Sequence, residues 1–164
     1  MIDARLTTST YTHYEDPLSN YDPPQYRNAL ERLLAETPVS EVQSNPYASV
    51  SPQTTIRSAI ALLADRQIAC VVVVEHGELR GVFTERDVLN KVADRYLAIC
   101  DRPVSEVMTA KPMYVYDTDT AASALCVMAA YGYRHVPVVN CEQQVQGVVS
   151  PRRIFGFVQQ HLLA

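Results

Sequence analysis

Apolar and polar positions along the chain follow one pattern twice, and this pattern predicts a fixed order of elements. A short extended piece around Val50 or Val115 comes first, and a helix follows, "TTIRSAIALLADR" or "DTAASALCVMAAYG", with apolar residues at helical spacing. Next come a valine-rich buried strand, "IACVVVV" or "HVPVVN", a turn, and a second strand, "LRGVF" or "VQGVV". A second helix closes each copy, "ERDVLNKVADRYL" or "PRRIFGFVQQHLL". The pattern therefore predicts two β-α-β-β-α units.

The two copies also share residues, which indicates an internal duplication. "PVSEV" occurs at 38–42 and again at 103–107, and further matches continue at an offset of 65, which becomes 66 after Gln143. The matching positions are mostly core residues and turn glycines, which a repeated fold unit preserves. A unit of about 60 residues has only a marginal core of its own. We therefore expect an α/β (α+β) fold in which repeat 1, residues 38–99, packs sheet to sheet against repeat 2, residues 100–164.

The first 37 residues do not belong to the repeat. They are polar, rich in tyrosine and interrupted by prolines, and they end in "PQYRNALERLLAET", whose leucines fall on one side of a helix. Residues 1–37 are therefore predicted to be an N-terminal arm followed by a short amphipathic helix. The arm, Met1–Pro23, is expected either to be mobile or to dock on a neighbouring chain.

Composition and charge exclude several classes of protein. The 164 residues carry a formal net charge of −4, which argues against a general nucleic-acid binder. The N-terminus lacks a secretory pattern and the longest apolar run, "IACVVVV", is too short to span a bilayer, so we expect a cytoplasmic protein without membrane contact. The four cysteines form no C-x-x-C pair; we expect reduced, hydrophobic cysteines and no metal site.

The stretch Gly81–Asp87, "GVFTERD", begins at a strand and ends in a helix. It matches a G-h-h-T-x-x-D pattern, in which h is apolar, and together with "RHVPVV" in the other copy it resembles a tandem CBS-domain pair, or Bateman module, over about Pro38 to Leu163. The resemblance implies two clefts between the repeats that bind adenosine-containing ligands (AMP, ADP, ATP, NAD-like compounds or S-adenosylmethionine). It also implies a regulatory rather than a catalytic role, and a disc-shaped homodimer.

Thr84 and Asp87 permit two interpretations. By spacing alone they form a capping box, with Thr84 as the N-cap and Asp87 as an acidic third residue. A carboxylate at a helix start also stays ionised and could accept ribose hydroxyls, while the free N–H groups could face a phosphate. The repeat context favours the second role, which is compatible with the first.

The second copy departs from the pattern. Ser150 and Pro151 make a good helix start, but Arg153 stands where the resemblance places the aspartate. Either this cleft is degenerate and empty, or Arg153 holds a phosphate, for which the forked guanidinium is suited.

The segments before the central strands differ between the copies. One copy has small apolar residues suited to an adenine face, and the other has a tyrosine that could stack on a base and two basic residues that could meet phosphates. The sequence does not assign either segment to one cleft. The candidate residues of these segments and of the matching helices are Ile68, Ala69, Cys70, Tyr133, Arg134, His135, Val136, Ala59 and Ala124.

The sequence lacks the usual catalytic motifs, among them a G-x-S-x-G turn, H-E-x-x-H and a phosphate-binding P-loop. The leading hypothesis is a stand-alone regulatory module that binds an adenine nucleotide, needs no other cofactor and signals to an unknown partner protein. The alternative is a dimerisation scaffold with non-binding clefts, and an enzyme is the third possibility.

Overall fold

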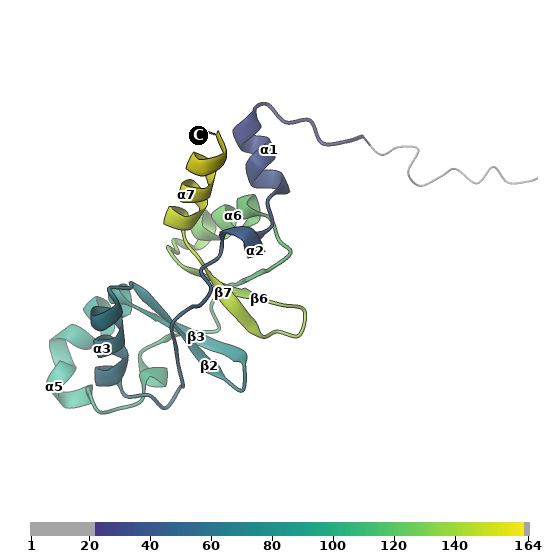
Figure 1. Cartoon of the computed structure of the whole chain (residues 1–164). Helices are drawn as coiled ribbons and strands as arrows, with labels where there is room; N and C mark the ends of the chain where they lie inside the picture. Colours follow the sequence, from purple (N-terminus) through teal and green to yellow (C-terminus); the bar gives the residue numbers. More distant parts are fainter. Residues whose placement is uncertain (1–21, 163–164) are drawn as a thin grey trace, which may run out of the picture.

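The computed structural model describes residues 22–162 and places the predicted strands and helices in two halves (Figure 1). The prediction for the arm concerns residues that, apart from 22 and 23, lie outside the described part of the chain. The repeated elements of the first half are β1 (Ser49–Val50), α3 (Ile56–Arg66), β2 (Cys70–Glu75) and β3 (Glu78–Thr84). Those of the second half are β5 (Val115–Tyr116), α6 (Ala121–Tyr131), β6 (Val136–Val139), β7 (Val145–Val149) and α7 (Pro151–Leu162).

The closing helix of the first repeat is interrupted, where the apolar pattern predicted a continuous one. It consists of α4 (Glu85–Asp87), a π-helical turn η1 (Val88–Val92), a 3-10 turn η2 (Ala93–Arg95) and α5 (Tyr96–Ile99). Within it, the N–H of Ala93 donates to the carbonyl of Val88, five residues back. The break leaves Val92 and Ile99 buried in the first core and Leu89 and Leu97 exposed.

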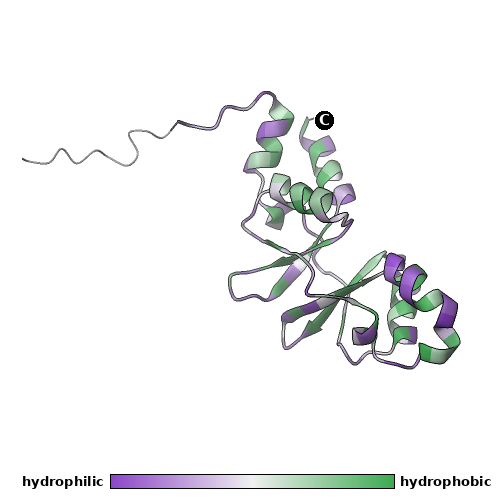
Figure 2. Cartoon of the chain, turned by 180° about the vertical axis from the view of Figure 1, so that it is seen from behind, coloured by the Kyte–Doolittle hydropathy of each residue, from purple (hydrophilic) through white to green (hydrophobic). Residues whose placement is uncertain are grey.

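Each half has its own sheet, and the two sheets pack against each other. The first sheet has the order β1-β2-β3-β4, where β4 is Thr109–Ala110, and the second has the order β5-β6-β7. In both, the first pair of strands is parallel and the next is antiparallel. Val72 from the first sheet packs with Val139, Val145 and Val148 from the second. The strands of both sheets are largely hydrophobic (Figure 2).

Each "PVSEV" segment packs into the half that is formed mainly by the other repeat. The first forms α2 (Val39–Val42) and buries Val39 and Val42 in the core of the second half. The second forms η3 (Val104–Glu106) and buries Val104 and Val107 in the core of the first half. Each half is therefore completed by a segment that belongs to the other repeat in sequence.

Backbone pairing shows the same exchange. Pro38 bridges to Thr120, and its equivalent Pro103 bridges to Thr55. The N–H of Val39 donates to the carbonyl of Asp119 at 2.7 Å, and the N–H of Val104 donates to that of Thr54 at 2.8 Å. The predicted boundaries at residues 38 and 100 follow the sequence repeat. The packed halves do not follow them, because residues 39–42 belong to the second core and residues 104–107 to the first.

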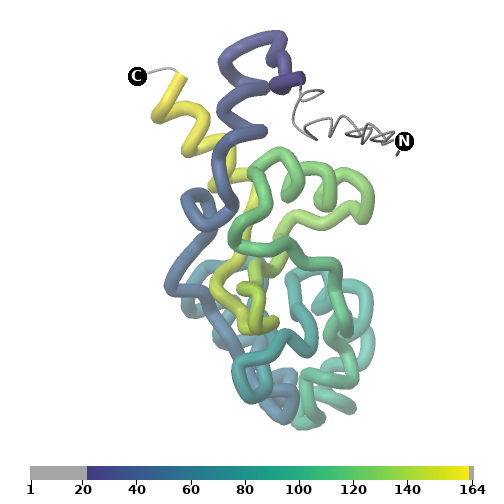
Figure 3. The backbone as a smooth tube through the Cα atoms, turned by 90° about the vertical axis from the view of Figure 1, so that its right-hand side faces the viewer, coloured from purple at the N-terminus to yellow at the C-terminus, as the bar shows by residue number. Residues whose placement is uncertain are grey.

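The predicted N-terminal helix is α1 (Ala29–Glu36), and it packs on the second half, against α6 and α7. Asn28 caps it by accepting from the N–H of Glu31 at 2.9 Å. It contacts α6 and lies beside α7, as the tube view shows (Figure 3). Leu34 is partly buried against the second core, so the apolar side of this helix is used within the chain.

Candidate functional site

Two cavities lie between the halves, and both are lined by residues from the two repeats. We call them the Asp87 cavity, of about 160 Å³, and the Arg153 cavity, of about 940 Å³. Ala69, Arg134 and His135 line both of them. The two cavities are equivalent under the internal repeat, because Thr84 and Asp87 occupy in one the positions of Ser150 and Arg153 in the other.

The end of β3 builds the floor of the Asp87 cavity. Thr84 is the N-cap of α4, and the N–H of Asp87 donates to its Oγ1 at 3.3 Å. In return the N–H of Thr84 donates to Oδ2 of Asp87 at 3.0 Å, so the predicted capping box is confirmed.

The Asp87 carboxylate is buried and receives four donors from the protein. Oδ2 accepts from the N–H of Thr84 and from its hydroxyl, the latter at 2.7 Å. Oδ1 accepts from the hydroxyl of Thr109 at 3.0 Å and lies 2.7 Å from Nζ of Lys91. A carboxylate has about four acceptor sites, so a ligand hydroxyl has to replace one of these donors. Thr84 and Thr109 both line the cavity, so their hydroxyls are donors that a ligand can reach and replace.

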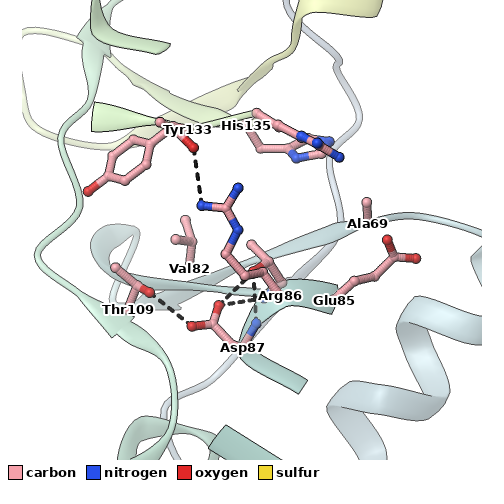
Figure 4. Close-up of a pocket in the computed structure, with 11 residues that line it drawn as sticks. Ala69, Val82, Glu85, Arg86, Asp87, Thr109, Tyr133 and His135 are labelled. Atoms are coloured by element: carbon pink, nitrogen blue, oxygen red, sulfur yellow. Dashed lines mark hydrogen bonds between the residues drawn. The ribbon is translucent and has the colours of Figure 1, made fainter. Parts of the chain in front are cut away.

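Arg86 crosses the Asp87 cavity. Its Nη1 donates to the carbonyl of Gly132 at 3.2 Å and thereby joins α4 to the residues that precede β6. In the close-up, the guanidinium lies between Asp87 below and Tyr133 above (Figure 4). With Arg86 in this position the cavity is smaller than the roughly 300–1,000 Å³ usual for ligand pockets. A nucleotide can enter only if this exposed side chain turns away.

The Arg153 cavity is large enough for a nucleotide without such a movement. The start of α7 supplies one wall, and the apolar segment Ile68–Cys70 supplies another. The loop before β1 contributes Ser44, Pro46, Tyr47 and Ala48. The Tyr47 hydroxyl donates to the carbonyl of Val145 at 3.2 Å, which fixes the ring at the cavity edge.

The two cavities differ in charge. The lining of the Asp87 cavity includes two arginines and two carboxylates, Glu85 and Asp87. Among residues 22–162, the lining of the Arg153 cavity contains no carboxylate. Its four arginines are Arg66, Arg134, Arg152 and Arg153. A chain with a net negative charge therefore concentrates positive charge at this cavity.

Burial changes the titration of two residues at these cavities. Burial lowers the pKa of His135 below 6.5, the nearby Glu85 opposes this shift and Arg134 adds to it. His135 is therefore largely neutral at pH 7. Burial, with a smaller contribution from the Asp87 charge, raises the pKa of the Cys70 thiol to about 12, so that Cys70 acts as an apolar group.

The structure separates the sequence-predicted residues into three groups. Thr84, Asp87 and Tyr133 line the Asp87 cavity; Ile68, Cys70, Ser150 and Arg153 line the Arg153 cavity; Ala69, Arg134 and His135 line both. The remaining three residues line neither cavity, because they are fully buried in the two cores: Ala59, Ala124 and Val136.

Sequence reasoning missed the residues that the exchanged segments bring in. Thr109 holds Asp87, and its repeat equivalent Ser44 lines the Arg153 cavity. The offset of 65 that relates the two "PVSEV" segments also relates Ser44 to Thr109, so extending the repeat comparison would have paired them. Arg66, Arg86 and Arg152 were also missed, although Arg86 and Arg152 are equivalent in the repeat.

The described residues contain neither a metal-ligand cluster nor a membrane-spanning helix. Between residues 22 and 162, no group of three or more His, Cys, Asp or Glu side chains is placed to hold a metal ion. Within the same range, no helix combines the length and the apolar character needed to cross a membrane.

Comparisons with known proteins agree with this architecture. A family model described as "CBS domain" matches residues 39–94 and 104–159. The chain is 32% identical over 115 residues to the CBS domain-containing protein CBSCBSPB1 of Arabidopsis thaliana, covering 70% of this chain but only 21% of that protein. It is 28% identical over 117 residues to an uncharacterised 17.7 kDa protein of Acidianus ambivalens, covering 71% and 70% of the two chains.

A solved structure is similar in both sequence and fold. It is a CBS domain protein from Pyrobaculum aerophilum complexed with AMP, with 31% identity and a TM-score of 0.65. The match covers 71% of this chain and 88% of that one.

Proposed function

Because the chain belongs to the CBS-domain family, we propose that it is a regulatory module that binds an adenosine-containing ligand between its two repeats. The observation that carries this proposal is the pair of repeat-equivalent cavities, each walled by both halves of the molecule. The AMP complex of the Pyrobaculum aerophilum relative supports the choice of ligand class.

Ligand binding would act on the contact between the halves. Arg86 links α4 to the carbonyl of Gly132, so displacing it removes one bond between the two repeats. The ligand supplies new contacts to both walls in its place. The resulting shift between the halves is the signal that we propose is passed to a partner protein.

We propose that the bound ligand is sensed and not turned over. In the described linings the hydroxyls of Thr84 and Thr109 donate to Asp87, but the Thr84 hydroxyl is engaged as the helix cap, and the thiol of Cys70 is held protonated. Cys126 and Cys141 are free and exposed, which fits a reducing compartment such as the cytoplasm.

A second candidate function is a scaffold whose clefts bind nothing. The complete set of donors to Asp87 and the position of Arg86 across the cavity favour it. The two functions differ in one measurement: AMP, ADP, ATP, NAD and S-adenosylmethionine are added in turn and the melting temperature is recorded. A regulatory module melts higher with at least one of them, since binding to the native state stabilises it. If none of the five compounds raises the melting temperature, the scaffold function is favoured.

Asp87→Asn tests the role of the Asp87 cavity. The amide has the shape of the carboxylate but lacks its charge, and one charge-assisted hydrogen bond contributes about 1.5–3 kcal/mol. We expect nucleotide affinity at this cavity, measured by calorimetry, to fall roughly tenfold or more. The free energy of unfolding should fall less, by about 0.5–2 kcal/mol, because part of the cap remains. Asp94→Asn, an exposed position of the same helical segment, is the matched control. Unchanged affinity in Asp87→Asn would mean that Thr84 and Asp87 only cap α4.

We further propose that the module is a homodimer. On the helices that close the two repeats, Val92 and Ile154 are buried inside the chain, whereas Leu89 and Phe155 are 71% and 58% exposed. Leu97, at 91%, adds to this apolar surface. Sedimentation at micromolar concentration is expected to give twice the chain mass, and Leu97→Glu combined with Phe155→Glu to reduce it. A clean single-chain mass for the parent protein would refute the dimer.

A further inference from the structure

The Arg153 cavity has an unbalanced charge. Among the residues that the structure describes, its four lining arginines form no ion pair and meet no lining carboxylate, whereas the Asp87 cavity sets Glu85 and Asp87 beside its two arginines. Like charges that converge on one hollow repel one another, and a bound anion removes this cost. The unpaired arginines therefore indicate that the ligand of this cavity carries several negative charges.

Arg153 replaces the group that would recognise a ribose. In the Asp87 cavity a carboxylate stands at this repeat position, and it can accept hydrogen bonds from the ribose diol. In the Arg153 cavity the same position carries only donors, and none of the lining residues within the described part of the chain is acidic. The Nη2 of Arg153 donates to the carbonyl of Gln43 at 2.8 Å, which fixes the guanidinium at the start of α7. Its other N–H groups remain available for a phosphate.

The opposite wall is suited to a flat apolar group. Ile68, Ala69 and Cys70 line it, and the pKa of the Cys70 thiol, which burial raises to about 12, keeps it uncharged. The ring of Tyr47 lies at the same cavity. The space of about 940 Å³ can hold a base on this wall and an extended phosphate chain among the arginines.

Building on the proposed function, we propose that the Arg153 cavity selects nucleotides by their phosphate chain and not by their ribose. It holds a nucleoside di- or triphosphate through Arg66, Arg152 and Arg153, and the 2′-hydroxyl contributes little. The Asp87 cavity has the opposite preference, because its carboxylate can accept a ribose hydroxyl in place of a protein donor such as that of Thr109. The two cavities of one chain thus respond to different parts of the same ligand class.

The test is calorimetry in the Asp87→Asn background, which weakens the other cavity. ATP is expected to bind at least tenfold more tightly than AMP, and 2′-deoxy-ATP to bind within about threefold of ATP. Arg153→Gln should weaken ATP roughly tenfold, since one charge-assisted bond to phosphate is lost. Arg66→Gln should act in the same direction without disturbing the contact to Gln43. Arg27→Gln, on an exposed residue ahead of α1, is the matched control and should change nothing.

The outcomes separate this inference from the proposed function. If AMP and ATP bind equally, if removal of the 2′-hydroxyl abolishes binding, or if both arginine variants bind ATP normally, the selection by phosphate is wrong while nucleotide binding stands. If no nucleotide binds the parent protein and inorganic tripolyphosphate does, the proposed function itself fails and the cavity is an anion site without a nucleoside preference. Melting curves of each variant show that it is folded.

Discussion

Val104→Asp is expected to destabilise the first half of the molecule, although the residue belongs to the second repeat. Val104 is fully buried among Ile56, Val71 and Phe83, and a carboxylate there has no partner. Burial of an unpaired charge lowers the free energy of unfolding by at least about 3 kcal/mol. Urea denaturation measures this loss.

Val39→Asp is the reciprocal variant and should weaken the second half by a similar amount, since Val39 is buried in that core. Amide hydrogen exchange locates the effect. Val104→Asp should speed exchange in β2 and α3, and Val39→Asp in β6 and α6. Ser40→Asp, at an exposed neighbouring position, is the control. Faster hydrogen exchange in the second half of Val104→Asp would contradict the placement of residues 103–107 in the first core.

Phe83→Ala is expected to lower the free energy of unfolding by about 3–5 kcal/mol. Phe83 is among the largest fully buried side chains, and it pairs with Val71 across β2 and β3. It precedes Thr84 directly, so a cavity at this position also loosens the strand end that carries the capping box. Chemical denaturation gives the loss of stability, and nucleotide affinity should fall with it.

Phe83→Leu is the milder companion variant, because leucine fills most of the space and leaves a smaller cavity. It should retain most of the stability and of the ligand binding. A cost below about 1 kcal/mol for Phe83→Ala would show that the first core can collapse around the missing ring.

The sequence predicted the elements well where local pattern decides them. The valine runs identified β2 and β6 because a buried strand needs consecutive apolar residues, and Thr84-x-x-Asp87 identified a capping box because its bonds span three residues. The interruption of the helix after Asp87 did not show in the pattern. It coincides with Lys91, whose Nζ donates to the carbonyl of Met108 at 3.3 Å, a contact between distant segments.

The composition of each cavity could be predicted only in part. The strand ends could be identified as candidate positions from the repeat, but which segments meet there depends on the packing of residues 38–44 and 103–109 into the opposite halves. Thr109 reaches Asp87 only through that exchange. Ala59, Ala124 and Val136 were chosen from the repeat, which preserves core positions as well as site positions, and the structure places them in the cores.

The exchange of the "PVSEV" segments also determines when each core can close as the chain leaves the ribosome. Val39 and Val42 are made long before Ile154, yet the core that buries them includes Ile154. The first core in turn waits for Val104 and Val107. Domains that are contiguous in sequence fold in order during synthesis. Here the nascent chain must instead hold Val39 and Val42 open to water, or to a chaperone, until Ile154 has been made.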